Sequence, residues 1–221
     1  AGSNSFLVVW GDAQPTPARI RGQRVEGGGA LLGSAFDISN GAGWAAFPEV
    51  TYSPALGEFI VAWEDTHAGS HEDIFMQRVT TTGEISGNNV SVSNEVGDQH
   101  MVALAANTVN HKVLFVWNDW RLGEPSLYGR EMDFSDGVPQ TPEFRISTAS
   151  IEESAPAVVA LPDASGYLVV WQAPTGAGDL FVRRVSSGAG PAGTPVPVSD
   201  DPRAQTRPAL AVSTAPVPHG A

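Results

Sequence analysis

The sequence predicts an all-β repeat protein, and three observations support this prediction. An apolar run that ends in tryptophan recurs four times, at residues 6–10, 59–63, 113–117 and 167–171. Gly and Pro, which favour turns, account for 24 and 17 of the 221 residues. No segment shows the apolar period and capping residues of a helix. Short strands in units of about 50 residues indicate a β-propeller, in which each sheet is covered by its neighbours.

The second unit is complete and predicts four strands in order. They are expected at residues 48–53, 59–63, 74–79 and 90–93, and we name these positions A, B, C and D. Strands A and D alternate apolar and polar residues, which is typical of a half-buried strand. Strand B is apolar throughout, as expected for a strand that is buried on both faces. A turn with Pro54 and Gly57 joins A to B, because Pro fixes φ and Gly accepts positive φ.

The other units repeat this order. Strand C recurs at 20–25, 127–132 and 180–185, strand D at 36–39, 144–147 and 196–199, and strand A at 100–104, 156–161 and 208–212. The chain therefore opens on a strand B and ends on a strand A. We expect a single domain, residues 1–221, with repeats at about 6–58, 59–112, 113–166 and 167–221. The predicted fold is a four-bladed β-propeller of four-stranded antiparallel blades, closed by pairing of the C-terminal strand with the N-terminal strands. A larger ring, completed by another segment or a second chain, is the alternative.

Short motifs also recur at fixed places in the units. The second unit carries a proline, a Ser-Pro turn, an apolar strand, an acidic loop and the start of strand C at Pro48, Ser53-Pro54, 59–63, Asp65 and Asp73-Ile74-Phe75. Asp119-Trp120-Arg121 matches the acidic loop in the third unit. This order resembles the TolB-type and related extracellular bacterial β-propeller repeats, although strand B here ends in Trp and no Asp-Gly follows Ser-Pro. The resemblance implies the fold and no particular activity, because propellers carry many functions.

The charge and composition limit the partners of the chain. A formal net charge of -12 at pH 7 repels phosphate, so nucleic acid and anionic membranes are not expected to bind. No apolar run approaches the roughly 18 residues of a membrane span. The absence of cysteine excludes disulfides and Cys-based zinc sites. Few lysines, many small residues and a start at Ala1 favour an exported, trimmed bacterial protein that is extracellular or on the cell surface.

Residues that follow the repeat are expected to be structural. The tryptophans that end strand B could be sugar platforms, but their shared position favours packing between blades, which buries about 150–250 Å² for each of Trp10, Trp63, Trp117 and Trp171. An aspartate follows two residues later in three units, at Asp12, Asp65 and Asp119. We expect its carboxylate to accept backbone N–H groups as in an Asx turn, rather than to bind a shared ion.

Metal and cofactor sites are not predicted. His67 and His71 lie near acidic residues, but a pair spaced by four converges only on a helix, and Gly69 in a polar loop argues against one. The alternating acidic pattern of a calcium loop is absent. We therefore expect no metal and no cofactor.

One face of the predicted disc carries most of the candidate binding residues. Successive hairpin loops alternate between the two ends of a sheet, so the B–C and D–A loops share one face. The loops of the other face are short and Gly-rich. Loops on a rigid scaffold commonly carry function. Trp44 and Trp120 have no counterpart in the other units, so packing explains them less well, although each could fold back over its own blade. The candidate ligand-binding residues are Trp44, Trp120, Arg121, His67 and His71.

The sequence does not indicate catalysis. It has no nucleophile elbow, phosphate-binding glycine loop or zinc-protease motif. We therefore expect a non-catalytic extracellular module, not an enzyme, that binds a glycan or a protein. The alternatives are a polysaccharide-acting propeller enzyme (a lyase or glycosidase) and a self-associating subunit of a surface array or filament. Carboxylates that converge in one pocket would favour the enzyme, and a large apolar patch would favour assembly.

Overall fold

A computed structural model describes residues 4–14, 16–41, 43–66, 71–134, 141–147, 153–173, 179–199, 201, 203 and 205–213. The secondary structure in these ranges consists of fifteen strands. They are β1 (Ser5–Asp12), β2 (Arg19–Glu26), β3 (Leu31–Asp37), β4 (Ala45–Ser53), β5 (Glu58–Asp65), β6 (Asp73–Thr80), β7 (Ile85–Ser93), β8 (Gln99–Ala106), β9 (Lys112–Asp119), β10 (Ser126–Asp133), β11 (Phe144–Arg145), β12 (Ser154–Ala160), β13 (Gly166–Ala173), β14 (Asp179–Ser186) and β15 (Gly190–Pro197). Within the described residues, no helix has the length and apolar character needed to cross a membrane.

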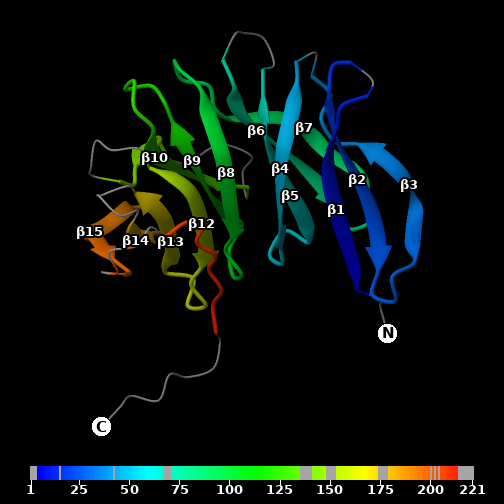
Figure 1. The fold of residues 1–221 in the computed structure, drawn as a ribbon. Coiled ribbons are helices and arrows are strands. Elements are labelled where there is room, and N and C mark those ends of the chain that lie inside the picture. Colours follow the sequence, from blue (N-terminus) through cyan, green and yellow to red (C-terminus); the bar gives the residue numbers. More distant parts are fainter. Residues whose placement is uncertain are drawn as a thin grey trace.

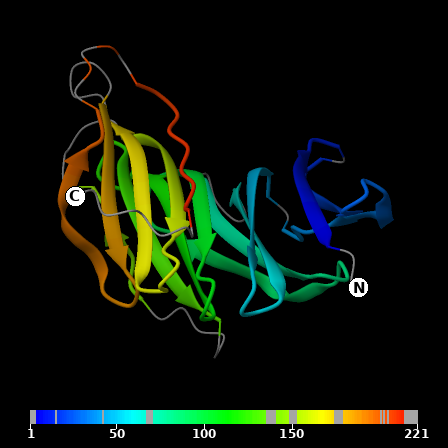
Figure 2. The same cartoon turned by 90° about the horizontal axis from the view of Figure 1, so that it is seen from below.

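The strands form four antiparallel sheets that stand side by side along an open arc (Figures 1 and 2). Each sheet is a meander in chain order: β1–β3, β4–β7, β8–β11 and β12–β15. We call them blades one to four. The predicted all-β fold and the A-B-C-D order are confirmed in blades two to four. Blade one contains only the strands at positions B, C and D.

The predicted closure of the ring is not found. The segment that was expected to be the closing strand A, within residues 205–213, forms no strand. It lies beside β12, at the opposite end of the arc from β1 (Figures 1 and 2). Among the described residues, β1 pairs with β2 alone. The reason is geometric, because the turn from one blade to the next is too small for four blades to complete a circle.

Strand B is the most buried strand of each complete blade. Every residue of β5 and of β9 after the first is buried. A neighbouring sheet lies on each side of these strands, which explains why their sequences are apolar without alternation. β1 has the same kind of sequence but is partly exposed along its length. It lies at one end of the arc, where the described chain covers only one of its faces.

The repeated tryptophans are packing residues, as predicted. Trp63, Trp117 and Trp171 are at most 1% exposed, whereas Trp10 in blade one is partly exposed. The structure adds a bond that the sequence did not predict. Asp65 Oδ2 accepts a hydrogen bond from Trp63 Nε1 at 2.8 Å, and Asp119 Oδ2 accepts one from Trp117 Nε1 at 2.9 Å. A buried indole N–H is costly without an acceptor, so each aspartate makes burial of its tryptophan possible.

The predicted turn role of the aspartates is confirmed at two positions. Asp12 Oδ1 accepts a hydrogen bond from the Gln14 backbone at 3.1 Å, and Asp119 Oδ1 accepts one from the Arg121 backbone at 2.9 Å. Ala173 takes this place in blade four. There Trp171 Nε1 has no partner at normal hydrogen-bonding distance. The indole N–H interacts more weakly with the buried Glu153 carboxylate and is the smallest of the causes that lower the pKa of Glu153.

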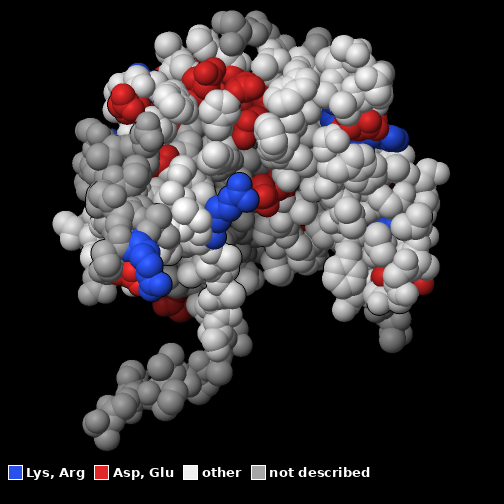
Figure 3. Space-filling view, in the orientation of Figure 1, with Lys and Arg blue, Asp and Glu red and all other residues white. Residues whose placement is uncertain are grey.

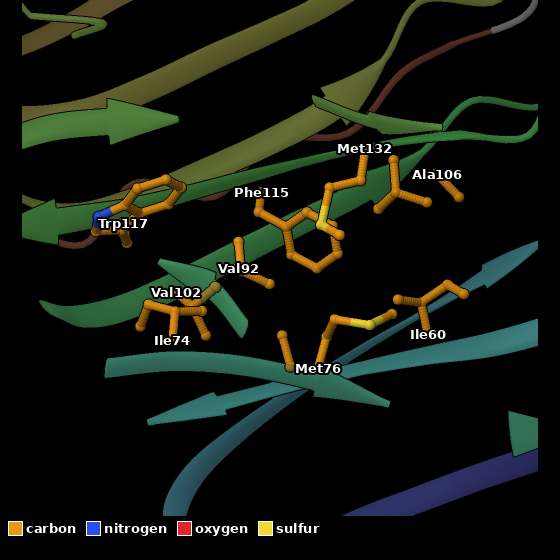
Figure 4. Packing of buried hydrophobic residues seen from close by; sticks show 11 residues of the cluster. Ile60, Ile74, Met76, Val92, Val102, Ala106, Phe115, Trp117 and Met132 are labelled. Carbon is orange, nitrogen blue, oxygen red and sulfur yellow. The ribbon is translucent and has the colours of Figure 1, made fainter. Parts of the chain in front are cut away.

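The core consists of apolar layers between neighbouring blades. Figure 4 shows the layer between blades two and three, where Ile60 and Met76 face Phe115, Trp117 and others. Similar layers lie between blades one and two and between blades three and four. Each blade is therefore stabilised mainly by the blades next to it, as in other repeat proteins.

The inner strands of blades two to four share a β-bulge near their start. The register of β4, β8 and β12 shifts there. A residue with positive φ lies in each bulge, namely Phe47 (51°), Met101 (54°) and Ala155 (48°). Such values are uncommon for residues other than glycine, and a bulge redirects the side chains around it. Phe47 and Met101 are 64% and 53% exposed, so they project from the inner strands and do not join the core.

We predict that Trp117→Ala lowers the free energy of unfolding by about 3–5 kcal/mol, because it empties a large core site and removes the donor to Asp119. Trp44→Ala is the control. Trp44 is 39% exposed, so the expected loss is about 1 kcal/mol or less. Urea unfolding followed by circular dichroism measures both. Equal losses would contradict the packing role of Trp117.

Candidate functional site

The bulged starts of β4, β8 and β12 line a concave surface on the face predicted to carry function. Two adjoining hollows of about 450 and 390 Å³ share His100 and Met101 as a common wall. Volumes of this size suit small-molecule or sugar ligands. We call the two hollows the central groove. Its lining includes Phe47, Glu49 and Glu64 on one side of the shared wall and Trp120 and Glu153 on the other.

His100 lies between two carboxylates that come from blade two. Its Nδ1 is 3.0 Å from Glu64 Oε2 and 3.1 Å from Glu72 Oε2. The Glu64 side chain is 5% exposed, and its other oxygen accepts the Met101 backbone N–H at 2.7 Å. The hydrogen bond to Glu64 is the main cause that raises the pKa of His100; partial burial opposes it, and the charges of Glu64, Glu72 and Asp98 support it. The imidazole thus connects β8 to blade two.

The same three residues could hold a metal ion. Within the described part of the chain, Glu64, Glu72 and His100 form the group whose ligand atoms lie close enough, all within 4.8 Å of one another. Carboxylate oxygens with an imidazole nitrogen suit a divalent first-row ion. Of the histidine pair considered in the sequence, His67 lies outside the described residues, and His71 Nδ1 contacts Asp98 Oδ1 at 3.2 Å.

Glu49 is a second carboxyl group in the hollow that contains Glu64. Crowding by the surrounding protein raises the pKa of Glu49, because loss of water disfavours the charged carboxylate. Of the described residues, none forms a salt bridge with it. A carboxyl group with a raised pKa keeps its proton to higher pH than an ordinary glutamic acid, which is the property required of a general acid.

Glu153 lines the other hollow but has a structural role. It is 2% exposed, and its Oε2 accepts the Leu127 backbone N–H at 3.2 Å. Burial raises the pKa of Glu153, while hydrogen bonds from Ser147 and Leu127 act against that rise. The carboxyl group therefore fixes the loop that precedes β12 onto blade three.

One predicted binding residue, Trp120, lines the central groove, and another, Trp44, contacts its lining. Trp120 is 42% exposed and lines the groove beside His100. Its backbone N–H donates to the Asp98 carbonyl at 3.0 Å, which fixes the turn after β9. Trp44 does not line the groove but packs edge-on against Phe47, which does, with ring centroids 6.0 Å apart. That either residue binds a ligand stays a prediction.

Arg121 is held away from any ligand by its own partners. Its guanidinium pairs with Asp119 and Glu143 and lies 4.2 Å above the Tyr128 ring. Partial burial lowers the pKa of Arg121, but the hydrogen bonds and charges of Asp119 and Glu143 raise it overall. The expectation that Arg121 binds ligand has no support in this geometry, because its donors are used to hold the loop.

Sequence reasoning missed the residues that form the centre of the groove, namely Phe47, Glu49, Glu64 and Met101. One available signal was a polar residue between the tryptophan and the aspartate of strand B, which in blade two is Glu64. Another was the proline that follows the bulge residue in two blades, at Pro48 and Pro156. Neither signal shows that these side chains meet His100 of another blade.

The surroundings of the groove are mainly acidic. Acidic side chains gather over the upper end of β8 and the loops beside it, and a basic side chain lies below them on the same face (Figure 3). This agrees with the formal net charge of -12. Such a field disfavours anionic ligands and favours neutral or cationic ones.

Comparisons with known proteins identify the fold. Neither the protein-family models nor the curated protein sequences give a match. Solved structures do match. The α-L-arabinanase of Penicillium chrysogenum, in complex with arabinobiose, is 16% identical with a TM-score of 0.65, over 95% of this chain and 64% of the arabinanase. The endo-arabinase of Bacteroides thetaiotaomicron is 13% identical with a TM-score of 0.52, over 90% of this chain and 82% of that one. The GH43B protein of the Bacteroides ovatus xyloglucan PUL is 14% identical with a TM-score of 0.51, over 89% and 40%.

These likenesses confirm the β-propeller and correct the expected function. The chain spans 64% of the length of the Penicillium arabinanase. At such low identity the likeness establishes the fold alone, and the TolB-type resemblance is not confirmed beyond it. The expectation of a non-catalytic binding module that is not an enzyme is wrong, because the structural neighbours are glycoside hydrolases. This finding favours the alternative, a polysaccharide-acting enzyme.

We predict that His100→Asn destabilises the protein more at acidic than at alkaline pH. The pKa of His100 is raised in the folded state, so its contribution is complete below the unfolded value of about 6.5 and is lost as pH rises through the folded value. For this partly exposed pair the expected loss at acidic pH is about 1 kcal/mol. Thermal unfolding across pH measures it.

His111→Asn serves as the control, because this exposed histidine lies in the β8–β9 turn, outside the groove. It should leave the pH dependence of stability unchanged. A His100→Asn penalty that grew toward alkaline pH would contradict the assigned ion pair.

Proposed function

We propose that the chain is a polysaccharide-acting enzyme, a glycosidase that binds its substrate in the central groove. The observation that carries this proposal is the presence of two carboxyl groups, Glu49 and Glu64, in one hollow of the groove. Most glycosidases use a pair of carboxyl groups on either side of the bond that is cleaved. The fold likeness to the arabinanases supports the same reading.

The two carboxyl groups differ in their surroundings, which suits different roles. The raised pKa of Glu49 allows it to hold a proton for the oxygen of the leaving sugar. Glu64 is fixed by the Met101 backbone N–H and by His100. A carboxylate held in this way can act on the sugar carbon directly or activate a water molecule. His100 positions Glu64 and does not itself need to touch the substrate.

Apolar side chains in the groove would bind the sugar rings. Phe47, Met101 and Trp120 are all exposed there. Sugars present apolar C–H faces that pack on aromatic rings, while their hydroxyl groups need polar partners nearby. The negative field favours a neutral glycan. Arabinan and xyloglucan are the first substrates to test, given the names of the structural neighbours. An extracellular location remains a prediction.

We predict that Glu49→Gln and Glu64→Gln each lower kcat/KM on the hydrolysed glycan by about 10²–10⁴-fold, the usual contribution of acid–base catalysis. Release of reducing sugar measures the rate. Glu84→Gln is the matched control, because Glu84 lies in the exposed β6–β7 turn and should leave the rate unchanged. The melting temperature of each variant excludes loss of folding. Full activity in both groove variants, with a folded wild type that cleaves glycan, would overturn the assignment.

The pH profile should report Glu49. A general acid works only while protonated, so kcat/KM is retained below the pKa of Glu49 and falls as pH rises through it. Because that pKa is raised, the alkaline limb should lie above that of an ordinary glutamic acid, about 4.3. Phe47→Ala should move this limb to lower pH by admitting water to the hollow. A limb that stays in place in this variant would show that another group is the acid.

A further inference from the structure

The two hollows of the central groove differ in the groups that they offer to a ligand. The hollow of about 450 Å³ contains Glu49 and Glu64, the two carboxyl groups assigned to bond cleavage. The hollow of about 390 Å³ contains Trp120 and one acidic residue, Glu153. Glu153 is 2% exposed and its Oε2 accepts the Leu127 backbone N–H, so its carboxylate is held inside the protein. We call the two spaces the carboxyl hollow and the Trp120 hollow.

Asn118 gives the Trp120 hollow an unused hydrogen-bond acceptor. This side chain lines the hollow and is 3% exposed. Its Nδ2 donates a hydrogen bond to the Glu153 carbonyl oxygen, which fixes the orientation of the amide and makes Oδ1 the acceptor. Within the described chain, Asn118 Oδ1 is buried and has no hydrogen-bond partner. A buried acceptor without a donor is costly, and a ligand hydroxyl group would supply the donor.

Ser154 and Gln172 add further neutral groups to the same hollow. They lie opposite each other in the register of β12 and β13, and both are partly exposed. Neither side chain forms a hydrogen bond with another of the described residues. A hydroxyl group and an amide can each both donate and accept. They therefore match the hydroxyl groups of a sugar and require no charge on the ligand.

Trp120 provides an apolar wall whose backbone is fixed. The residue is 42% exposed, and its backbone N–H donates to the Asp98 carbonyl oxygen at 3.0 Å. Gly97, with a φ of 95°, lies so close that an added Cβ would be 3.0 Å from the Trp120 carbonyl carbon. A group presented from a fixed turn loses little freedom when a ligand binds. The apolar C–H face of a sugar can pack on the Trp120 ring.

A shared wall makes the two hollows neighbouring sites. His100 and Met101 line both of them. The Nδ1 atom of His100 is directed at Glu64 and Glu72, which fixes the wall in place. Both volumes lie near the lower end of the roughly 300–1,000 Å³ of ligand pockets, which suits one small unit in each hollow. Because a single pair of residues separates the hollows, consecutive units of one chain can fill them.

We propose that the Trp120 hollow binds a neutral sugar unit next to the unit whose bond is cleaved in the carboxyl hollow. This inference rests on the proposed function and adds that the substrate is an oligosaccharide or polysaccharide, not a glycoside of a single sugar. Binding of the neighbouring unit contributes free energy that orients the reacting bond, so a truncated substrate loses kcat as well as affinity. An anionic unit is disfavoured, because acidic side chains gather around the groove (Figure 3).

The preference for long over short substrates tests the inference. The long substrate is whichever of arabinotetraose and a xyloglucan oligosaccharide is cleaved, and the short one is the nitrophenyl glycoside of its terminal sugar. The wild type should favour the long substrate. Trp120→Ala should lower the ratio of the two kcat/KM values by about 10–100-fold, the usual effect of one lost apolar contact on enzyme specificity. Gln172→Met, which keeps the size of the side chain and removes the amide, should lower it too.

Leu122→Ala is the matched control for Trp120→Ala. Leu122 is 61% exposed in the turn that begins at Trp120, and it lines neither hollow. This change should leave the ratio of the two kcat/KM values as it is in the wild type. The melting temperature of each variant shows whether it is folded.

Calorimetric titration with the same oligosaccharides separates this inference from the proposed function. It uses Glu64→Gln, which should leave the sugar chain intact, with and without Trp120→Ala, and the second change should weaken binding. Cleavage by the wild type with a ratio that Trp120→Ala does not alter would overturn the inference and leave the proposed function. Binding that depends on Trp120, without cleavage by the wild type, would overturn the proposed function alone. Neither binding nor cleavage would overturn both.

Discussion

The structure depends on the burial of strand B on both of its faces. A run such as Phe59 to Trp63 cannot be covered by its own sheet, so it requires an apolar neighbour on each side. This requirement sets the side-by-side order of the blades and places large side chains between them. The aspartates that bind the tryptophan indoles allow the widest of these side chains to be buried without an unpaired donor. The arc follows from this repeated packing.

The central groove arises where the repeat is interrupted. Regular inner strands would alternate their side chains and leave a smooth inner wall. The bulges in β4 and β8 instead turn Phe47 and Met101 outward and bring the Met101 N–H to Glu64. One backbone irregularity therefore supplies both the apolar surface and the fixed carboxylate. His100 lies next to the same bulge, which explains how residues of two blades meet at one place.

Local sequence patterns were sufficient to predict the strands, but not to predict whether the ring closes or which residues meet at the site. The sequence predicts strand B and the role of Trp63 because buried positions require apolar residues, and these residues recur at the same place in each repeat. It predicts closure wrongly because the angle between blades depends on side-chain packing across the interface. The Glu64–His100 contact joins residues 36 positions apart, and nothing in either local pattern marks their meeting. The expectation that Trp44 and Trp120 share one face rests on strand order alone, which the sequence shows, whereas the partners of Arg121 follow from tertiary contacts.

An open arc also distributes stability unevenly. Blades two and three are covered on both sides, whereas blade one has a described neighbour on one side only and three strands in place of four. In a linear array with nearest-neighbour coupling, local opening starts at the ends and moves inward. The groove lies over the middle of the array, so its residues belong to the part of the chain that opens last. The ends can fray while the geometry around His100 is retained.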